Sequence, residues 1–353
     1  MECFSKILVI KLDHIGDLIL ATPVFKAISE KYPDAKVDAL VSKKSKAVIE
    51  NSPYIETIYS YESRDFDRNH SIDNIILADN IATICKIRQQ HYDLVIGLRE
   101  DLSNIPIQMM CGGAKNISFS TNSRFAEYLD EAIPNDENRH SAKINFDLLS
   151  LLDITLPEEI SPQIFVGNED KEWAKTFLEN VCGMNRSKLL GFSIGGGWFL
   201  NWWPIHNYAK LAELLVKRYK DLSIVLVGGT AETALEEEFR KLTKVPYVSA
   251  VGKTSVKQLA ALYSYMDLLV TNDGGPMHMA TAAGTPVIAL FGPSPYNRFG
   301  PLGKDNVIIS KNFECSPCPQ FVQGEKPKCL DNKCMKAITV EEVYNEVVKK
   351  LDA

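Results

Sequence analysis

The stretch KLDHIGDLILATP, Lys11–Pro23, decides the fold class because it joins a strand to a helix. The residues before it, Ile7–Ile10, are all aliphatic and predict a buried strand, whereas Gly16 to Pro33 predict a helix. A strand that turns directly into a helix is the repeating unit of parallel α/β sheets. Dinucleotide-binding enzymes place G-x-G-x-x-G at this turn, but here Gly16 is followed at once by Asp17. The turn therefore presents a carboxylate where many folds bind a phosphate.

The composition is that of an ordinary globular protein of about two domains. Of 353 residues, 45% are hydrophobic and 24% are charged, and the net charge of -6 argues against a general nucleic-acid binder. We find no apolar stretch of about 18 residues, as a membrane helix would need, and no signal peptide at the N-terminus. We therefore expect a cytoplasmic protein, in which the eight cysteines are reduced or metal-bound.

Strand-like and helix-like segments alternate through both halves of the chain, which predicts two Rossmann-like α/β domains facing across a cleft. Ligands of such sheets bind beyond the carboxyl ends of the strands. We expect a first domain over residues 1–165, a linker over 166–187, a second domain over 188–338 and a C-terminal helix over 339–353. The expected strands are 6–12, 36–42, 56–61, 93–98, 188–194, 222–227, 247–252, 267–273 and 286–292, and the expected helices are 16–33, 43–53, 81–92, 140–154, 206–219, 231–243, 255–266, 275–284 and 339–351.

The most informative segment of the second half is TNDGGPMHMATAAGTP, Thr271–Pro286. Gly274 and Gly275 let the backbone approach a ligand closely, and the following helix offers free N–H groups and a positive dipole end. His278, in the first turn, could donate to a phosphate oxygen. The alternative is an ordinary strand–helix connection in which His278 is a core residue.

Two further glycine turns follow predicted strands of the second half. Gly195-Gly196-Gly197 precedes the aromatic stretch WFLNWWP, and Gly228-Gly229-Thr230 lies just before Glu232. Three glycine turns at strand ends predict that this half binds a nucleotide, although any one of them is weak evidence.

Together these segments resemble the lipopolysaccharide heptosyltransferases, glycosyltransferase family nine, across nearly the whole chain. IKLDHIGDLILATPVFKAI is similar to the family's N-terminal signature, and LLVTNDGGPMHMATAAGTPVIALFGPSPYNRFGP to its C-terminal signature. The resemblance implies a GT-B fold and an inverting, metal-independent transfer of a heptose or related sugar from ADP-heptose. The implied acceptor is lipid A–Kdo or core oligosaccharide, reached through peripheral contact with the cytoplasmic face of the inner membrane. No catalytic cofactor is implied.

The resemblance assigns roles to residues of both halves. Asp17 becomes the candidate general base, although taken alone it would cap the helix, and a helix N-terminus lowers a carboxylate's pKa. Lys11 could reach the leaving phosphate, and Arg99 and Lys43 could meet an acidic acceptor; the alternative is that all three are solvated charges. The implied donor-binding residues are Asp273, Gly274, Gly275, His278, Glu232, Thr254, Ser255, Gly195, Gly196 and Asn201.

The chain departs from the family at Asn201, where relatives often have a lysine that contacts the donor phosphate. The missing charge implies that another cation supplies it, that the donor differs, or that donor affinity is reduced.

Four cysteines lie within 313–335, with the spacing Cys315-x2-Cys318-x10-Cys329-x4-Cys334. Four thiolates can hold a structural zinc ion or an iron–sulfur cluster. Reduced free thiols are the alternative.

Two other function classes stay open from the sequence. One is another GT-B nucleotide-sugar enzyme, such as an epimerase or a transferase with a different donor. The other is an inactive nucleotide-sugar-binding protein, which only Asn201 supports.

Overall fold

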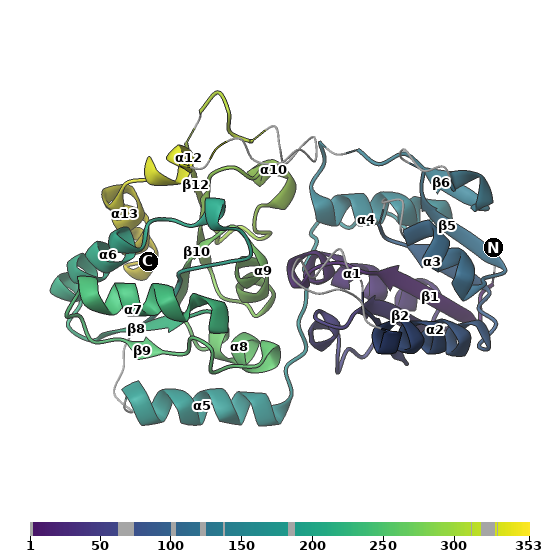
Figure 1. Cartoon of the computed structure of the whole chain (residues 1–353), viewed down its shortest axis with the longest axis horizontal. Helices are drawn as coiled ribbons and strands as arrows, with labels where there is room; N and C mark the ends of the chain where they lie inside the picture. The colour runs from purple at the N-terminus through teal and green to yellow at the C-terminus, as the bar shows by residue number, and fades with distance from the viewer. Residues whose placement is uncertain are drawn as a thin grey trace. The chain divides into compact units, whose positions relative to one another are not determined.

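Two parallel six-stranded sheets organise the chain (Figure 1). The computed structural model describes residues 3–62, 74–99, 104–120, 125–136, 138–182, 188–311, 313–318, 329 and 331–353. The chain divides into two compact units, Met1–Phe165 and Val166–Ala353, and each unit contains one of the sheets.

The first sheet has the strand order β3-β2-β1-β4-β5-β6, and every neighbouring pair is parallel. Its central strands are aliphatic and buried on both faces, as parallel sheets covered by helices require. Ile7 of the first strand lies between Val37 and Leu94 of its two neighbours. The strands are β1 (Lys6–Lys11), β2 (Lys36–Ser42), β3 (Ile58–Tyr61), β4 (Leu94–Gly97), β5 (Lys115–Phe119) and β6 (Glu131–Ile133).

Helices cover both faces of this sheet. On one face α1 (Ile15–Lys31) packs against α4 (Ser141–Leu149), and on the other α2 (Asn74–Arg88) packs against α3 (Asn104–Cys111). The second pair buries Ile84, Ile87 and Ile107 against strand side chains, forming one apolar core with β1, β2 and β4. Because α1 follows β1 directly, the residues of the connecting turn stand at the carboxyl edge of the sheet.

The second sheet repeats the topology of the first. Its strand order is β12-β11-β10-β7-β8-β9. Read from its other edge, with β7 counted as the first strand, this is the same 3-2-1-4-5-6 order as in the first sheet. All its neighbouring pairs are parallel. The strands are β7 (Lys188–Ser193), β8 (Leu222–Val227), β9 (Val248–Ser249), β10 (Leu268–Asn272), β11 (Val287–Phe291) and β12 (Val307–Ser310).

The helices of the second unit form two groups by their contacts. The helix α6 (Ile205–Arg218) packs against both α7 (Thr233–Leu242) and α13 (Val340–Leu351), and α8 (Val256–Tyr263) packs against both α5 (Asn168–Cys182) and α9 (Gly275–Ala282). A capping box starts each of α8 and α13, formed by Ser255 with Gln258 and by Thr339 with Glu342. In each box the hydroxyl accepts from the backbone N–H three residues on, and the side chain of that residue accepts from the N–H of the capping residue. Two short helices, α10 (Tyr296–Phe299) and α12 (Lys333–Lys336), complete the unit.

The alternation predicted from the sequence is confirmed, and two of the predicted ranges differ in the structure. Residues 43–53 are not an α-helix but contain only the short 3-10 helix η1 (Lys46–Val48). Asn51, with φ 67°, is left-handed there and stops helical propagation. The range 166–187, expected as a linker, contains α5 packed on α8.

Among the residues that the structure describes, no helix has the length and apolar character needed to cross a membrane.

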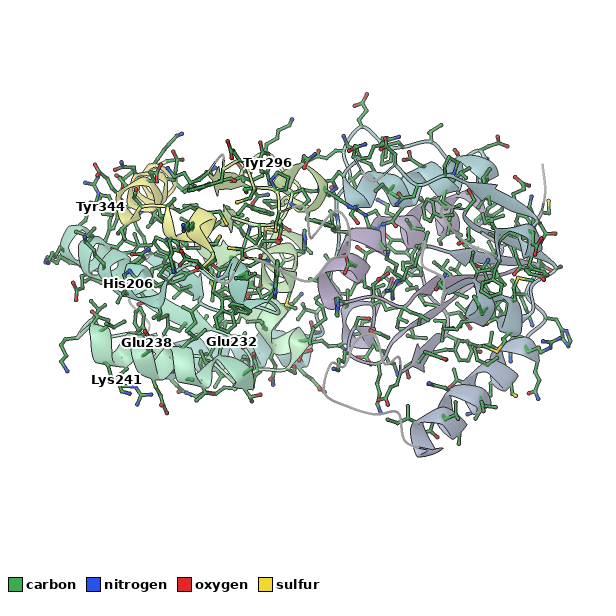
Figure 2. All side chains as sticks on the ribbon, turned by 45° about the horizontal axis from the view of Figure 1, so that its top comes forward. His206, Glu232, Glu238, Lys241, Tyr296 and Tyr344 are labelled. Atoms are coloured by element: carbon green, nitrogen blue, oxygen red, sulfur yellow. The ribbon has the colours of Figure 1, made fainter. Side chains whose placement is uncertain are left out.

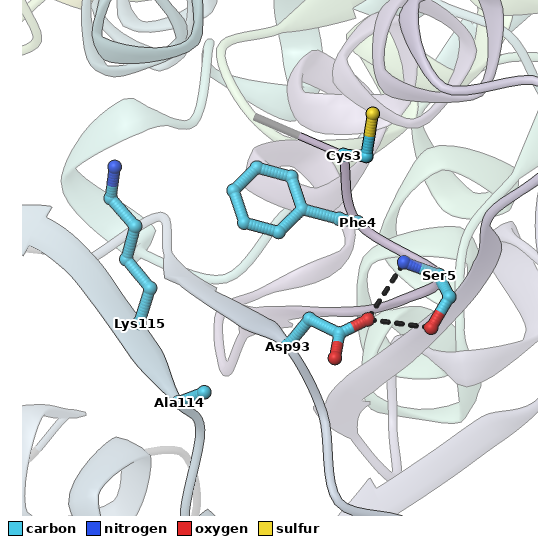
Figure 3. Close-up of a pocket in the computed structure, with 6 residues that line it drawn as sticks. All are labelled: Cys3, Phe4, Ser5, Asp93, Ala114 and Lys115. Atoms are coloured by element: carbon cyan, nitrogen blue, oxygen red, sulfur yellow. Dashed lines mark hydrogen bonds between the residues drawn. The ribbon is translucent and has the colours of Figure 1, made fainter. Parts of the chain in front are cut away.

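Asp93 joins the amino ends of the central strands in the first sheet (Figure 3). One carboxylate oxygen, Oδ2, accepts hydrogen bonds from the backbone N–H and the hydroxyl of Ser5, both at 2.7 Å, and from the N–H of Lys6 at 2.9 Å. These bonds, led by the Ser5 hydroxyl, hold the pKa of Asp93 below its ordinary value. A shallow pocket lies here beside Phe4 and Lys115. It opens at the amino ends of the strands, the edge opposite to that where parallel α/β sheets bind ligands.

Asp93→Asn should make the protein less stable at neutral pH, and the deficit should vanish in acid. A lowered folded-state pKa stabilises above the unfolded pKa of about 3.9 and is lost as pH falls through the folded value. We expect a loss of about 1 kcal/mol in the free energy of unfolding at pH 7, because partial exposure screens the charge. Urea unfolding at a series of pH values measures it. Asp34→Asn, at an exposed aspartate, is the control and should leave stability unchanged.

Candidate functional site

Each sheet has a topological switch point, where adjacent strands are followed by loops that run to opposite faces. In the first sheet this point lies between β1 and β4, and in the second between β7 and β10. Such points are where open α/β sheets bind ligands. The ends of these strands and the segments after them include most of the candidates: Lys11, Asp17 and Arg99 in the first unit, and Gly195, Gly196, Asn201, Asp273, Gly274, Gly275 and His278 in the second.

Asp17 lies in the first turn of α1, immediately after the switch-point strand β1. The helix has His14 as its N-cap residue, so Asp17 is not the cap that its isolated sequence predicts. Gly16 beside it is buried, and Asp17 itself is partly buried. The carboxylate therefore stands at the carboxyl edge of the first sheet.

The surroundings of Asp17 raise its pKa above the ordinary value. Burial is the largest cause, and the negative charge of Asp13 adds to it. The cationic groups of Lys11, His14 and Arg99 act in the opposite direction but do not cancel the rise. The net direction is therefore opposite to the lowering expected from a helix N-terminus alone. A higher pKa makes the carboxylate a stronger proton acceptor.

Lys11 and Arg99 both bind Asp13 in the structure. The Lys11 ammonium lies 3.0 Å from Oδ2 of Asp13 and donates to the Leu98 carbonyl at 2.8 Å. The Arg99 Nε lies 3.3 Å from Oδ1 of the same carboxylate, and its guanidinium donates to the Leu12 carbonyl at 2.7 Å. Neither side chain is a freely solvated charge, which was the alternative for both. Lys43 is exposed and pairs with Glu62 at 2.8 Å.

Asp273 and the glycines after it form the turn from β10 into α9. Gly274 has φ 152° and ψ -172°, a conformation that side chains disfavour, so only glycine fits there without strain. The helix begins at Gly275 with Pro276 in its first turn, where the missing N–H costs nothing. His278 is buried in the same turn. The first backbone N–H groups of an eight-residue helix thus point to the carboxyl edge of the second sheet.

The glycine turns after β7 and β8 lie against the side chain of Glu232. Figure 2 labels this glutamate. A Cβ at Gly195 would lie 2.2 Å from Cγ of Glu232, and one at Gly228 would lie 2.9 Å from its Cβ. The N–H of Gly196 donates to Oε1 of Glu232 at 3.4 Å. Glu232 ends the 3-10 helix η6 (Thr230–Glu232). The structure therefore brings Gly195, Gly196 and Glu232 together, and the absent side chains make space for the carboxylate.

Thr254 and Ser255 lie on the loop after β9, beside the turn that carries Glu232. Gly252 donates from its N–H to the Gly228 carbonyl at 2.9 Å, which joins the two loops. The Ser255 hydroxyl accepts from the N–H of Gln258 at 3.1 Å and caps α8. Thr254 is partly buried.

Asn201 binds Asp273 directly. Its amide donates to Oδ2 of Asp273 at 3.1 Å, and its carbonyl oxygen accepts from the Ser294 hydroxyl at 3.4 Å. Next to it, the Trp202 indole donates to the Gly196 carbonyl at 3.0 Å. The 3-10 helix η5 (Phe199–Asn201) is thereby held against both the first glycine turn and the Asp273 turn.

Asn272 was missed by the sequence-based prediction and connects these loops. Its amide donates to the Gly195 carbonyl at 3.0 Å, and its oxygen accepts from the Trp203 N–H at 3.0 Å and the Tyr208 hydroxyl at 3.2 Å. Asn272 is buried, and both the nitrogen and the oxygen of its side-chain amide have hydrogen-bond partners. The feature of the sequence that could have identified this residue is an asparagine at the end of a largely apolar strand.

The predicted four-cysteine metal centre is not supported. Cys318 and Cys334 are buried, Cys329 is partly exposed and Cys315 is exposed. Among the residues that the structure describes, which leave out 319–328 and 330, no group of three or more metal-ligating side chains is arranged around a common point. Burial, with the neighbouring charges of Cys315 and Cys329, raises the pKa of the Cys334 thiol and favours its protonated form. The thiols are free in the structure.

Gly195→Ala should destabilise the protein by about 1–3 kcal/mol, the usual range for overpacking, because its Cβ would overlap Glu232. Gly197→Ala is the matched control, since nothing lies within 4 Å of a Cβ there, and it should stay within about 0.5 kcal/mol of the wild type. The double variant Gly195→Ala/Glu232→Ala should recover much of the loss, since the overlapping side chain is gone. Chemical unfolding of all three measures this, and an unchanged Gly195→Ala would refute the packing.

Known proteins share both this sequence pattern and this architecture. Lipooligosaccharide heptosyltransferase 2 of Campylobacter jejuni is 23% identical over 347 residues, which cover 95% of this chain and 96% of that protein. The glycosyltransferase family 9 structure from Veillonella parvula superimposes with a TM-score of 0.86 at 23% identity, covering 100% and 99% of the two chains. The Escherichia coli heptosyltransferase WaaC with ADP has a TM-score of 0.75 at 16% identity, covering 98% and 99%.

These likenesses confirm the predicted GT-B fold of two Rossmann-like domains. The family model described as glycosyltransferase family 9 (heptosyltransferase) matches residues 81–328, which is well over half of the chain. The match covers the loops after β7, β8, β9 and β10 that form the second-unit site. The chain therefore belongs to glycosyltransferase family 9, the heptosyltransferases.

Proposed function

We propose that this enzyme transfers a heptose from ADP-heptose to a lipopolysaccharide core acceptor, with inversion at the anomeric carbon. The observation that carries the proposal is the turn at Asp17, a partly buried carboxylate of raised pKa at the switch point of the first sheet. The names of relatives supply the substrate class, since they are lipooligosaccharide heptosyltransferases and one was solved with ADP.

The donor site of the proposal is the carboxyl edge of the second sheet. The N-terminus of α9 offers backbone N–H groups and a positive dipole end to the diphosphate, and Gly274 and Gly275 allow close approach. Asp273 and His278 lie at the same turn and would contact the diphosphate and the sugar. Glu232 would contact the ribose, and Thr254 and Ser255 the adenine. The Ser255 hydroxyl already caps α8, so its adenine contact would come through its backbone.

Asn201 shapes the donor site through Asp273. Its neutral amide donates to the Asp273 carboxylate, so that oxygen is oriented but not neutralised. The diphosphate charge would then be balanced chiefly by the α9 N-terminus, whose dipole favours anions. We infer that this site holds the donor with fewer side-chain cations than relatives that carry a lysine at this position.

Asp17 is the general base of the proposed reaction. An acceptor hydroxyl gives its proton to the Asp17 carboxylate while its oxygen forms a bond to the anomeric carbon of the heptose. The bond from that carbon to the diphosphate breaks on the opposite side, and ADP leaves with the electron pair, which inverts the configuration. N–H groups of the α9 N-terminus stabilise the charge that develops on the leaving phosphate.

The acceptor side of the proposal depends on the surface of the first unit. Lys43 is exposed beside Glu62 and would meet an acidic group of the acceptor or an anionic membrane surface. Arg99 and Lys11 would reach a ligand only by leaving Asp13, so we do not assign them to acceptor or donor binding. A lipid-linked acceptor implies peripheral contact with the inner membrane, on its cytoplasmic face.

Asp17→Asn should lower turnover by about 10²–10⁴-fold, the usual contribution of a general base, with little loss of donor affinity. The amide keeps the shape of the side chain but cannot accept the proton. Product mass with ADP-heptose and a defined lipid A–Kdo acceptor measures turnover, and calorimetry with ADP measures donor-site integrity. Glu30→Gln, near the other end of the same helix, should behave as the wild type. Full turnover by Asp17→Asn would reject the assignment of the base.

The activity should fall with decreasing pH at a pH above the ordinary range of an aspartate. Asp17 must be deprotonated to accept the proton, and its raised pKa moves the acid limb of kcat/KM upward. A pH–rate profile with saturating and limiting acceptor measures the limb. A profile that stays flat down to the ordinary aspartate range, about pH 4, would contradict the raised pKa.

A parallel reaction without acceptor separates transfer from epimerisation. The proposal expects no sugar product beyond slow hydrolysis when acceptor is omitted. Conversion of the nucleotide sugar into an isomer without acceptor would favour an epimerase instead.

A further inference from the structure

Asp13 is held between two cations beside the proposed base. Its Oδ2 lies 3.0 Å from the Lys11 ammonium and its Oδ1 lies 3.3 Å from Nε of Arg99. The three side chains come from the end of β1, the turn after it and the segment after β4, so they span the switch point of the first sheet. All three are largely buried, with side-chain exposures of 9% for Lys11, 13% for Asp13 and 21% for Arg99.

The backbone around this ion cluster is fixed by the same side chains. The Lys11 ammonium donates to the Leu98 carbonyl at 2.8 Å, and the Arg99 guanidinium donates to the Leu12 carbonyl at 2.7 Å. The Asp13 carbonyl accepts from the Ser42 hydroxyl at 2.8 Å, which ties the turn to the end of β2. Each cation therefore reaches across the switch point to the neighbouring strand end, and Asp13 receives both.

We propose that Asp13 and Arg99 are positioning residues for Asp17: a buried carboxylate–guanidinium pair that sets the charge beside the base and holds the turn that carries it. The inference rests on the proposed function only in taking Asp17 as the base. In this inference Arg99 binds Asp13 and the Leu12 carbonyl within the first unit and does not bind the acceptor.

The two residues act on Asp17 with opposite signs. The groups whose charges bear on Asp17 are Asp13, Lys11 and His14 from the β1–α1 segment and Arg99 from the segment after β4. The Asp13 charge disfavours a second negative charge nearby, whereas Lys11, His14 and Arg99 favour it. Asp13 also partly neutralises Lys11 and Arg99. Removing the Asp13 charge therefore abolishes its repulsion of the Asp17 carboxylate and strengthens the attraction of that carboxylate to Lys11 and Arg99.

Opposite shifts of the acid limb test the proposal. Asp13→Asn keeps an oxygen for Lys11 and Arg99 but removes the charge, so the acid limb of kcat/KM should move to lower pH. Its plateau rate should also fall, because a weaker base accepts the proton less readily. Arg99→Gln removes the facing cation, so the limb should move to higher pH. Arg99→Lys keeps a positive charge and should leave the limb close to that of the wild type.

A merely structural role would not produce this pattern. Destabilised variants lose activity at all pH values without shifting the limb, and thermal unfolding of each variant identifies them. If Arg99 contacted the acceptor instead, Arg99→Gln would raise the acceptor KM and leave the limb in place. Shifts in the same direction for Asp13→Asn and Arg99→Gln, or an equal shift for Arg99→Lys and Arg99→Gln, would also overturn the proposal.

Failure of the proposed function is distinguishable from failure of this inference. If Asp17→Asn stays fully active, the base is misassigned. The effect of Asp13 and Arg99 on the titration of Asp17 can still be measured in that case. Carboxyl ¹³C NMR of aspartate-labelled protein, with the Asp17 signal identified by its loss in Asp17→Asn, reports that titration directly. The midpoint should fall in Asp13→Asn and rise in Arg99→Gln, and the absence of both shifts would reject the inference without reference to turnover.

Discussion

The parallel pairing of β1 with β4 and of β7 with β10 is the constraint on which both candidate sites depend. Parallel strands end at the same edge of a sheet, and at these two pairs the following loops leave toward opposite faces. Side chains from segments far apart in sequence therefore meet there without a dedicated scaffold. Arg99 reaches the Leu12 carbonyl and Asn272 reaches the Gly195 carbonyl for the same geometric reason.

The two switch points use this geometry with different chemistry. In the first unit, carboxylates and cations are packed together, and burial makes each charge sensitive to its neighbours. In the second unit, neutral amides and an indole hold the loops, and the acidic Glu232 and Asp273 are bound there by the Gly196 N–H and the Asn201 amide. Acidic side chains suit the hydroxyl groups of sugars, whereas backbone N–H groups at a helix start suit phosphate. The proposed proton-transfer site and the proposed nucleotide-sugar site can thus share one topology.

Much of this architecture could be predicted from the sequence, because long aliphatic runs and glycine turns report the backbone directly. The strand over Lys6–Lys11 and the helix after Gly274 are examples. The edge strand β6 has only three residues, too few to show a pattern. The segment 43–53 has helix-forming residues, yet a left-handed Asn51 ends it after one 3-10 turn.

Pairings between distant side chains were beyond sequence reasoning. Lys11 and Arg99 look like ligand-binding cations in the sequence, and only the fold shows that Asp13 lies between them. The Asn201 amide looks like a lost charge until Asp273 is found 3.1 Å from it. Such contacts depend on which strands are neighbours, and strand order is not written in any local segment.

The fit between Gly195 and Glu232 restricts the order in which this site can change during evolution. A side chain at residue 195 has no space while the long glutamate is present, because its Cβ would lie 2.2 Å from Cγ of that residue. A lineage must therefore shorten residue 232 before it can enlarge residue 195, and the reverse path passes through a clashing intermediate. These two positions, which are 37 residues apart in the sequence, should consequently change together.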